Sequence, residues 1–134
     1  MNDVITIAFI IILFIIFDLV FINFFVGHKW KDTITKIQNK NKPEIRPLYA
    51  IFSYIMLIIG LILFVYLPNK DRECTELYYI AFAWGFLVYS IFDLTNLALF
   101  KDYPLQLAMI DMFWGGFVSA ISVYFACLIS KSLS

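Results

Sequence analysis

Three aspartates stand inside long stretches of sequence that otherwise carry no charge: Asp18, Asp93 and Asp111. The stretches have the length of membrane helices, and an ionised aspartate at the centre of such a helix costs roughly 2.5–3.5 kcal/mol on insertion scales. No lysine or arginine lies in the same stretches to pair with the acids. We therefore expect the carboxyl groups to be protonated, to share a cation or to meet water, and they are the candidate functional residues.

The three aspartates also share one depth. Asp18 lies ten residues before His28, Asp93 lies eight before Lys101, and Asp111 lies seven after Pro104. These separations are roughly 10–15 Å along a helix. Tyr54 joins this layer, seven residues after Pro47. In the third stretch, Tyr89, Asp93 and Asn96 recur at i, i+4 and i+7 and so face one side of a helix. We expect these side chains to meet in a common interior.

The elements that position these residues follow from composition. Of the 134 residues, 63% are hydrophobic and only 15% are charged, against roughly 25% charged in an average soluble domain. Four stretches each exceed the roughly 18-residue threshold for a membrane helix, and they cover about residues 5–27, 48–67, 77–100 and 105–130. The sequence predicts an all-α, integral membrane four-helix bundle, with one transmembrane domain spanning 1–134. A net charge of zero argues against a nucleic-acid partner.

A short repeat suggests how the bundle is built. The tetrapeptide Ile-Phe-Asp-Leu occurs at 16–19 and again at 91–94, in the first and third stretches. The stretch that follows each copy opens on Pro-Leu, and the seventh residue after that proline is Tyr54 in one case and Asp111 in the other. The pattern favours two helical hairpins in parallel repeat about an axis along the membrane normal. A chance match in Ile- and Phe-rich sequence is the alternative.

Positive charge predicts the orientation. Six of the basic residues lie in the connection 28–47 and one more in the third connection, against three at the opposite side. Basic loops stay in the cytoplasm, so we expect both termini outside or in a lumen. Trp30, Ile34 and Ile37 share one helical face, which favours a helix lying on anionic lipid headgroups. The alternative is a solvated connector.

Several cofactors are excluded by residue type. The single histidine, His28, rules out a bis-histidine haem within one chain, and no mid-membrane lysine could carry retinal. No Cys/His pair has metal-ligand spacing, although carboxylate oxygens could hold a divalent cation. No cofactor is therefore predicted. Cys74 and Cys127 fall on the same side and could form a disulfide, but we favour small buried thiols.

One run of motifs resembles a known family. The sequence Asp-Leu-Thr-Asn-Leu-Ala at 93–98, then Lys101, Tyr-Pro at 103–104 and Asp-Met-Phe-Trp-Gly at 111–115 is similar to small membrane proteins catalogued as domain of unknown function 2177. The resemblance implies four spans and an integral membrane location. It also marks matching positions as site residues: Asp18, Asp93, Thr95, Asn96, Asp111, Trp114 and Gly115. This chain departs from the family at Phe21 and Asn23, where Trp and Gly are common.

Three functions fit these observations. The leading hypothesis is transport of protons, cations or a small polar solute, by a homo-oligomer because one four-helix chain has little room for a pore. The second is an enzyme embedded in the membrane that modifies a lipid or acyl chain, with carboxylates as acid and base or as metal ligands. The third is an accessory subunit whose acids hold helices together. The candidate site residues are Asp18, Tyr54, Asp93, Thr95, Asn96 and Asp111.

Overall fold

The computed structural model describes residues 2–134, and every regular element among them is a helix. The elements are α1 (Asp3–Phe21), η1 (Ile22–Val26), α2 (Gly27–Gln38), α3 (Pro47–Leu61), η2 (Ile62–Tyr66), α4 (Leu67–Asn69), α5 (Cys74–Leu99) and α6 (Leu105–Leu133). The two η elements are π-helical turns that continue α1 and α3. Four continuous helical segments are long and apolar enough to cross a membrane. The all-α membrane bundle predicted from the sequence is thus confirmed.

Local sequence explains where the helices begin and end. The side chain of Asn2 accepts hydrogen bonds from the backbone N–H groups of Val4 at 2.9 Å and Ile5 at 3.3 Å, which caps α1. Pro47 occupies the first turn of α3, where its missing N–H group costs nothing. Asn39, with a φ of 56°, ends α2 in the left-handed conformation that asparagine tolerates.

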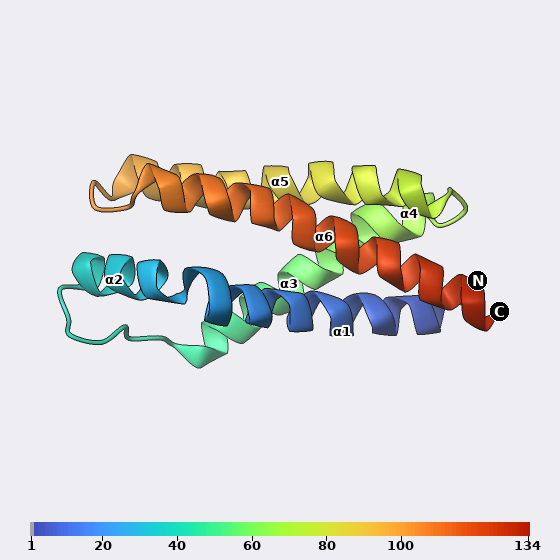
Figure 1. Cartoon of the computed structure of the whole chain (residues 1–134), viewed down its shortest axis with the longest axis horizontal. Coiled ribbons are helices and arrows are strands. Elements are labelled where there is room, and N and C mark those ends of the chain that lie inside the picture. Colours follow the sequence, from blue (N-terminus) through green and yellow to red (C-terminus); the bar gives the residue numbers. More distant parts are fainter. Residues whose placement is uncertain (1) are drawn as a thin grey trace.

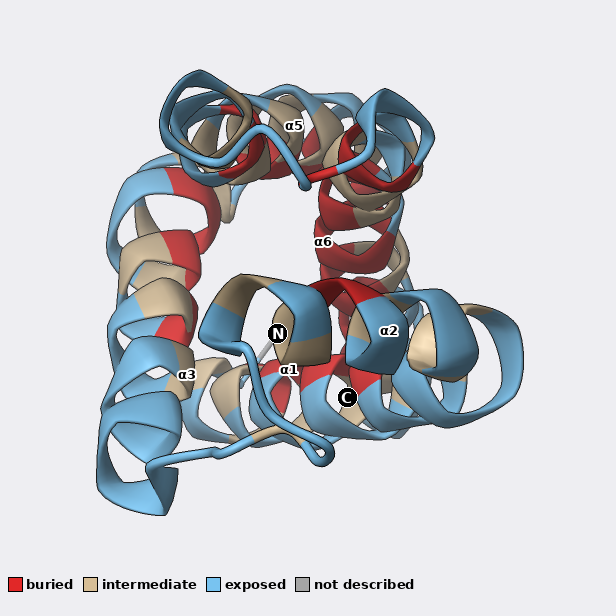
Figure 2. Cartoon of the chain, turned by 90° about the vertical axis from the view of Figure 1, so that its left-hand side faces the viewer, coloured by how far each residue is buried: buried red, intermediate tan, exposed pale blue. Residues whose placement is uncertain are grey.

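The bundle is held mainly by α6 (Figure 1). This helix packs along α5 and crosses α1, while α3 reaches α5 chiefly through η2. Viewed from the end of the bundle, the buried residues of all four long segments face the middle (Figure 2). The two hairpins of the proposed repeat therefore pack differently, because α5 and α6 are in close contact whereas α1 and α3 touch little.

Two glycines explain the tight second hairpin. A Cβ atom on Gly85 would lie 2.3 Å from the carbonyl oxygen of Gly115, and one on Gly115 would lie 2.0 Å from the ring of Tyr89. The backbones can approach this closely only because both side chains are absent. In the first hairpin, Gly60 instead faces the ring of Trp84 across the bundle.

The first helical segment is longer than predicted. It continues past residue 27 through η1 and α2 to Gln38, and α2 extends in nearly the same direction as α1 (Figure 1). The predicted amphipathic helix is present, but part of its apolar face is used inside the protein. Val26 and Ile37 pack against Tyr103 and Leu107 at the α5–α6 turn. Contact with lipid headgroups stays a prediction for the basic residues of this region.

The chain ends and one disulfide lie at the opposite end of the bundle. Both termini are found at the same end (Figure 1), where a disulfide joins Cys74 at the start of α5 to Cys127 near the end of α6. Our preference for two free buried thiols was therefore wrong. The antiparallel packing of α5 on α6 brings the two Cα atoms to 5.8 Å, a separation that a disulfide can span.

Candidate functional site

Two of the predicted acids meet where α5 packs on α6. Asp93 is fully buried, and its Oδ1 accepts a hydrogen bond from the hydroxyl group of Tyr103 at 2.8 Å. Asp111, on α6, is a close neighbour of Asp93, although no hydrogen bond joins the two carboxyl groups in the described structure. Oδ2 of Asp93 is buried and accepts no hydrogen bond from the described residues. Two carboxyl groups thus face each other in the bundle interior.

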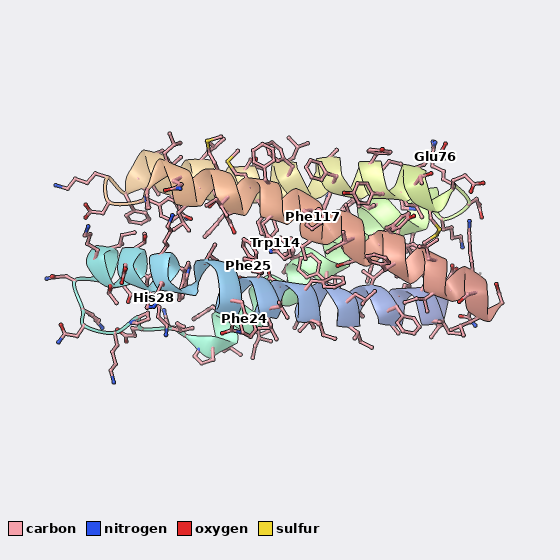
Figure 3. All side chains as sticks on the ribbon, in the orientation of Figure 1. Phe24, Phe25, His28, Glu76, Trp114 and Phe117 are labelled. Carbon is pink, nitrogen blue, oxygen red and sulfur yellow. A yellow bond between two sulfur atoms is a disulfide. The ribbon has the colours of Figure 1, made fainter. Side chains whose placement is uncertain are left out.

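The third acid is held by two other helices. Asp18, on α1, is 5% exposed and accepts a hydrogen bond from the hydroxyl group of Tyr54 on α3. Its other oxygen accepts a 2.9 Å hydrogen bond from Nε1 of Trp114 on α6. The Trp114 ring stacks on Phe21, with 4.1 Å between ring centroids, and Figure 3 shows Trp114 lying between α6 and α1. Asp18 therefore joins three helices.

Tyr89 and Asp111 lie between these two groups. Asp111 interacts electrostatically with both Asp93 and Asp18. Tyr89 packs over Gly115 and is in electrostatic range of all three aspartates. The three acids predicted to share one layer are therefore neighbours in the fold, although they do not converge on a single point.

Of the two remaining predicted site residues, Asn96 lies near Asp93 and Thr95 does not. The side chain of Asn96 lies beside the hydroxyl group of Tyr103 and so belongs to the Asp93 group. Thr95 is exposed, and its hydroxyl group donates to the carbonyl oxygen of Ile91 at 2.6 Å. The structure therefore does not bring Thr95 to the site. A threonine that bonds back to its own helix in this way commonly has no further role.

Among residues 2–134, the ion pairs involve only residues near the helix ends or in connections, and none includes Asp18, Asp93 or Asp111. The same residues contain no group of three or more His, Cys, Asp or Glu side chains that could hold a metal ion. The three aspartates thus have hydroxyl, indole and carboxyl groups as polar neighbours, rather than basic side chains.

Most of the chain matches one family model. The family model for domain of unknown function 2177, described as a predicted membrane protein, matches residues 3–128. The chain belongs to this family. No curated protein and no solved structure matches it. The match includes the three aspartates, Tyr54, Tyr103 and Trp114, so the whole site lies within the family region.

Sequence reasoning missed part of this site. From the sequence, Tyr103 and Trp114 enter only through the family resemblance, and no contact with an aspartate is predicted for either residue. The local sequence does not predict that these two residues donate hydrogen bonds to aspartates. Tyr103 reaches Asp93 only because it folds back from a turn, and Trp114 is 96 positions from Asp18. The one available clue for Trp114 was its position three residues after Asp111, which puts both on the same helical face.

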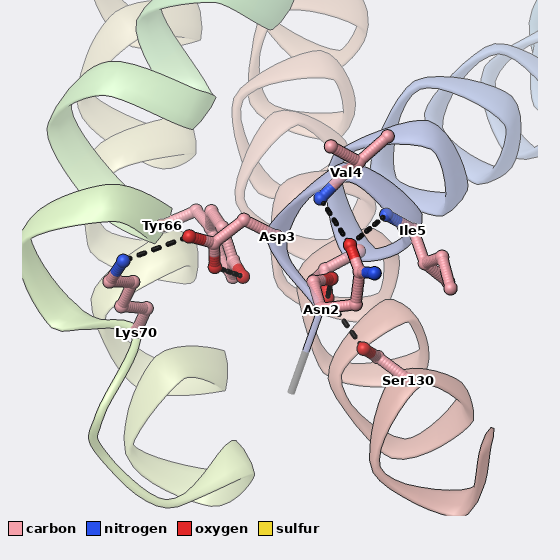
Figure 4. Close-up of polar contacts among 8 residues, drawn as sticks. Asn2, Asp3, Val4, Ile5, Tyr66, Lys70 and Ser130 are labelled. Carbon is pink, nitrogen blue, oxygen red and sulfur yellow. Dashed lines mark hydrogen bonds and ion pairs between the residues drawn. The ribbon is translucent and has the colours of Figure 1, made fainter. Parts of the chain in front are cut away.

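A second polar cluster lies at the end that carries the termini (Figure 4). Thr6, fully buried, donates from its hydroxyl group to Ser130 at 2.7 Å. The hydroxyl group of Tyr66 donates to Oδ1 of Asp3 at 2.8 Å, and Nζ of Lys70 donates to Oδ2 at 2.8 Å. Hydrogen bonding to Asp3 raises the pKa of Lys70 above its ordinary value. Asp3 and Lys70 both lie outside the apolar stretches, and no local sequence pattern pairs them.

The buried face of α6 carries polar groups between the two clusters. Ser119 is fully buried and donates to the carbonyl oxygen of Gly115 at 2.8 Å. Ser122 is also fully buried, and its hydroxyl oxygen has no hydrogen-bond partner among the described residues. Asp111, Gly115, Ser119 and Ser122 recur at intervals of four, four and three residues and so lie along one side of α6, and Ser130 continues the polar side chains toward the chain ends.

Proposed function

We propose that this membrane protein transfers protons through the interior of its own bundle. The observation that carries the proposal is the fully buried Asp93, whose Oδ2 has no hydrogen-bond partner in the described chain. A second acid, Asp111, is its close neighbour, and neither acid has a basic partner among the described residues. Two ionised carboxylates cannot remain in contact in a medium of low dielectric constant. A proton shared between them relieves the repulsion and supplies the donor that Oδ2 of Asp93 lacks.

The side chains around the pair supply steps toward one end of the bundle. Tyr103 lies in the α5–α6 turn and bonds to Asp93, so its hydroxyl group connects the pair with the end of the bundle that carries the basic connection. Asn96 lies next to the same hydroxyl group. This half of the proposed path is short, since Asp93 lies eight residues from Lys101, or roughly 12 Å.

Toward the other end the path follows α6. Ser119 and Ser122 carry it from Asp111, and Ser130 joins Thr6 near the termini. Asp111 and Ser119 are eight residues apart, as are Ser122 and Ser130, and eight residues span about 12 Å of helix. Water must therefore bridge these two gaps during transfer. The hydroxyl group of Ser122 would bind such a water molecule, because it is buried and has no hydrogen-bond partner among residues 2–134.

The orientation is part of the proposal. The basic connection predicts that the α2–α3 end faces the cytoplasm. The disulfide supports the same orientation independently, since it lies at the opposite end and disulfides persist in oxidising compartments. Protons would therefore pass between an outer or lumenal end at Asp3 and Lys70 and a cytoplasmic end at Tyr103.

The test is proton flux into proteoliposomes, followed by a pH-sensitive dye inside the vesicles under an imposed potential. We expect flux from the wild type and its loss in Asp93→Asn and Asp111→Asn, which keep the shape of the side chain but cannot exchange a proton. Asp102→Asn is the matched control, because Asp102 is an exposed acid in the same turn region. Melting temperatures measured in detergent would show that all four proteins fold.

Unchanged flux in both site variants would overturn the proposal, as would a lack of flux from well-folded wild-type protein. A protein in which the acids only hold helices together would show lower melting temperatures in the site variants without any proton flux. An enzyme acting on lipid would instead change the lipids of the vesicles, which mass spectrometry of the same samples detects.

A further inference from the structure

An apolar groove separates α1 from α3. Its volume is about 470 Å³, and its lining consists of seven isoleucines, Leu19 and Tyr54. Both helices are long and apolar enough to cross a membrane, and they make few contacts with each other. The groove therefore lies at the depth where the hydrocarbon of the bilayer replaces water. A space of this kind is filled by lipid chains or by another helix.

The lining favours a lipid chain. Helices in membranes approach one another through glycine, alanine and serine, and the described lining of this groove contains none of these residues. Ile55 and Ile59 stand at the rim, 43% and 44% exposed, while Ile58 lies at the base, 6% exposed. A thin flexible chain can follow such an irregular wall, and the volume is within the roughly 300–1,000 Å³ typical of small-molecule sites.

Charge at one end of the groove indicates the headgroup. Leu19 and Ile51 mark this end, and the connection at 39–46 runs past it from α2 to α3 (Figure 2). Lys42 and Arg46 lie in this connection outside any ion pair in the described chain, and the Arg46 guanidinium group sits 4.5 Å from the centre of the Tyr49 ring. Basic residues at a membrane surface attract anionic lipid headgroups.

We propose that the groove binds one acyl chain of an anionic phospholipid, with the headgroup held at Lys42 and Arg46. Arg46 precedes Ile51 by five residues, or roughly 7.5 Å along a helix, which places the charge just beyond the end of the apolar wall. The chain also lies against Tyr54, whose hydroxyl group bonds to Asp18. The bound acyl chain would therefore cover the hydrogen bond between Tyr54 and Asp18 on the side that faces the bilayer.

The experiment uses the full chain in vesicles that contain phosphatidylglycerol or phosphatidylcholine with a photoactivatable acyl chain. Peptide mass spectrometry after illumination maps the cross-linked residues. We expect cross-links to concentrate on the groove, at Ile55 and Ile59, well above those on Leu87 and Ile91. The latter are more exposed, at 63% and 70%, and sit on the outer face of α5, so they report ordinary lipid contact.

Two sets of variants separate the parts of the site. Ile55→Trp fills the groove and should lower its cross-linking about tenfold, as overfilling an apolar site does, while Ile91→Trp should leave it unchanged. Replacing Lys42 and Arg46 by glutamine should reduce the preference for phosphatidylglycerol about fivefold for each charge. Cross-linking to phosphatidylcholine in the groove should persist in this double variant, because the apolar wall is intact.

Three results would overturn the proposal. Cross-linking spread evenly over exposed apolar residues would mean ordinary lipid contact only. Cross-linking of one chain to another through Ile55, after cysteine is introduced there, would mean that a second copy fills the groove. An equal yield from both phospholipids would reject the role of Lys42 and Arg46. None of these results depends on proton flux, so the proposed function stands or fails separately.

Discussion

The hydroxyl group of Tyr103 reaches back from the α5–α6 turn and donates a 2.8 Å hydrogen bond to Oδ1 of Asp93. Both residues are buried, at 7% and 0% exposed. This is the only hydrogen bond to the Asp93 carboxyl group from the described residues, since the other oxygen, Oδ2, is buried without a partner. Val26 and Ile37 pack against the α5–α6 turn that contains Tyr103.

Removal of this donor should destabilise the protein. In Tyr103→Phe the Oδ1 atom of Asp93 loses its donor, so that neither carboxyl oxygen has one among the described residues, and an unpaired buried polar group costs roughly 1–3 kcal/mol. The free energy of unfolding, measured in detergent by circular dichroism against denaturant, should fall by about this amount. Tyr79→Phe is the control, because Tyr79 lies on α5, the helix of Asp93, and is 72% exposed. Equal stability of the two variants would show that the Tyr103 bond contributes nothing.

The indole N–H group of Trp114 should matter separately from its ring. Trp114→Phe retains an aromatic ring that can stack on Phe21 but removes the 2.9 Å bond to Asp18. We expect a loss of roughly 1–2 kcal/mol, the range for hydrogen bonds to charged or polar acceptors. Phe117→Tyr, in which an exposed ring next to Trp114 gains a hydroxyl group, should have little effect. Similar losses in both variants would point to general disturbance of α6.

The two tightly packed glycines should tolerate alanine poorly. Gly85→Ala would push against the backbone of Gly115, and Gly115→Ala would push against the first atoms of the Tyr89 ring, which cannot move without α5. Overpacking of this kind costs roughly 1–3 kcal/mol or more. Gly60→Ala meets only the far edge of the Trp84 ring, at 2.8 Å, and should cost less. Melting temperatures of the three variants, measured in one detergent, test this predicted order of stability. A Gly60→Ala protein that is less stable than the other two would contradict it.

Much of this fold and site follows from sequence, because the relevant signals are local. Uninterrupted apolar stretches identify the four membrane helices, and the position of a charge within a stretch gives its depth. The repeat also predicted that Tyr54 corresponds to Asp111. In the structure Tyr54 contacts Asp18 and Asp111 contacts Asp93, so the paired positions have equivalent neighbours.

The rest depends on contacts between distant residues, for which one sequence has no signal. Trp114 becomes a donor to Asp18 only through the rotation of α6 against α1. Lys70 and Asp3 are 67 positions apart, and each alone resembles an ordinary charge near a helix end. The direction of α2 is decided by the packing of Ile37 at the α5–α6 turn, where its amphipathic pattern suits a membrane surface equally well.

Loss of the disulfide should weaken the end of the bundle that carries the termini. The bond closes a loop between positions 53 apart, Cys74 and Cys127. Native disulfides typically contribute roughly 2–4 kcal/mol, and a loss of this size should appear in the unfolding of the Cys74→Ser, Cys127→Ser double variant. Mass spectrometry after treatment with a thiol reagent checks the bond directly. Modification of both cysteines in unfolded, unreduced wild-type protein would show that they are free.

The ion pair between Lys70 and Asp3 should make stability depend on pH only in alkali. Hydrogen bonding to Asp3 raises the pKa of Lys70 above its ordinary value in the folded protein. A raised pKa means that the contribution is complete below the ordinary lysine pKa and disappears as the pH rises through the higher folded value. Lys70→Gln should therefore be less stable than wild type at about pH 8, and the difference should vanish well above the ordinary lysine pKa of about 10.4. Melting temperatures of both proteins across this range provide the measurement, and the comparison cancels other groups that titrate in alkali. A difference that persists at the highest pH would assign the effect of Lys70 to the packing of its side chain, since that contribution does not titrate.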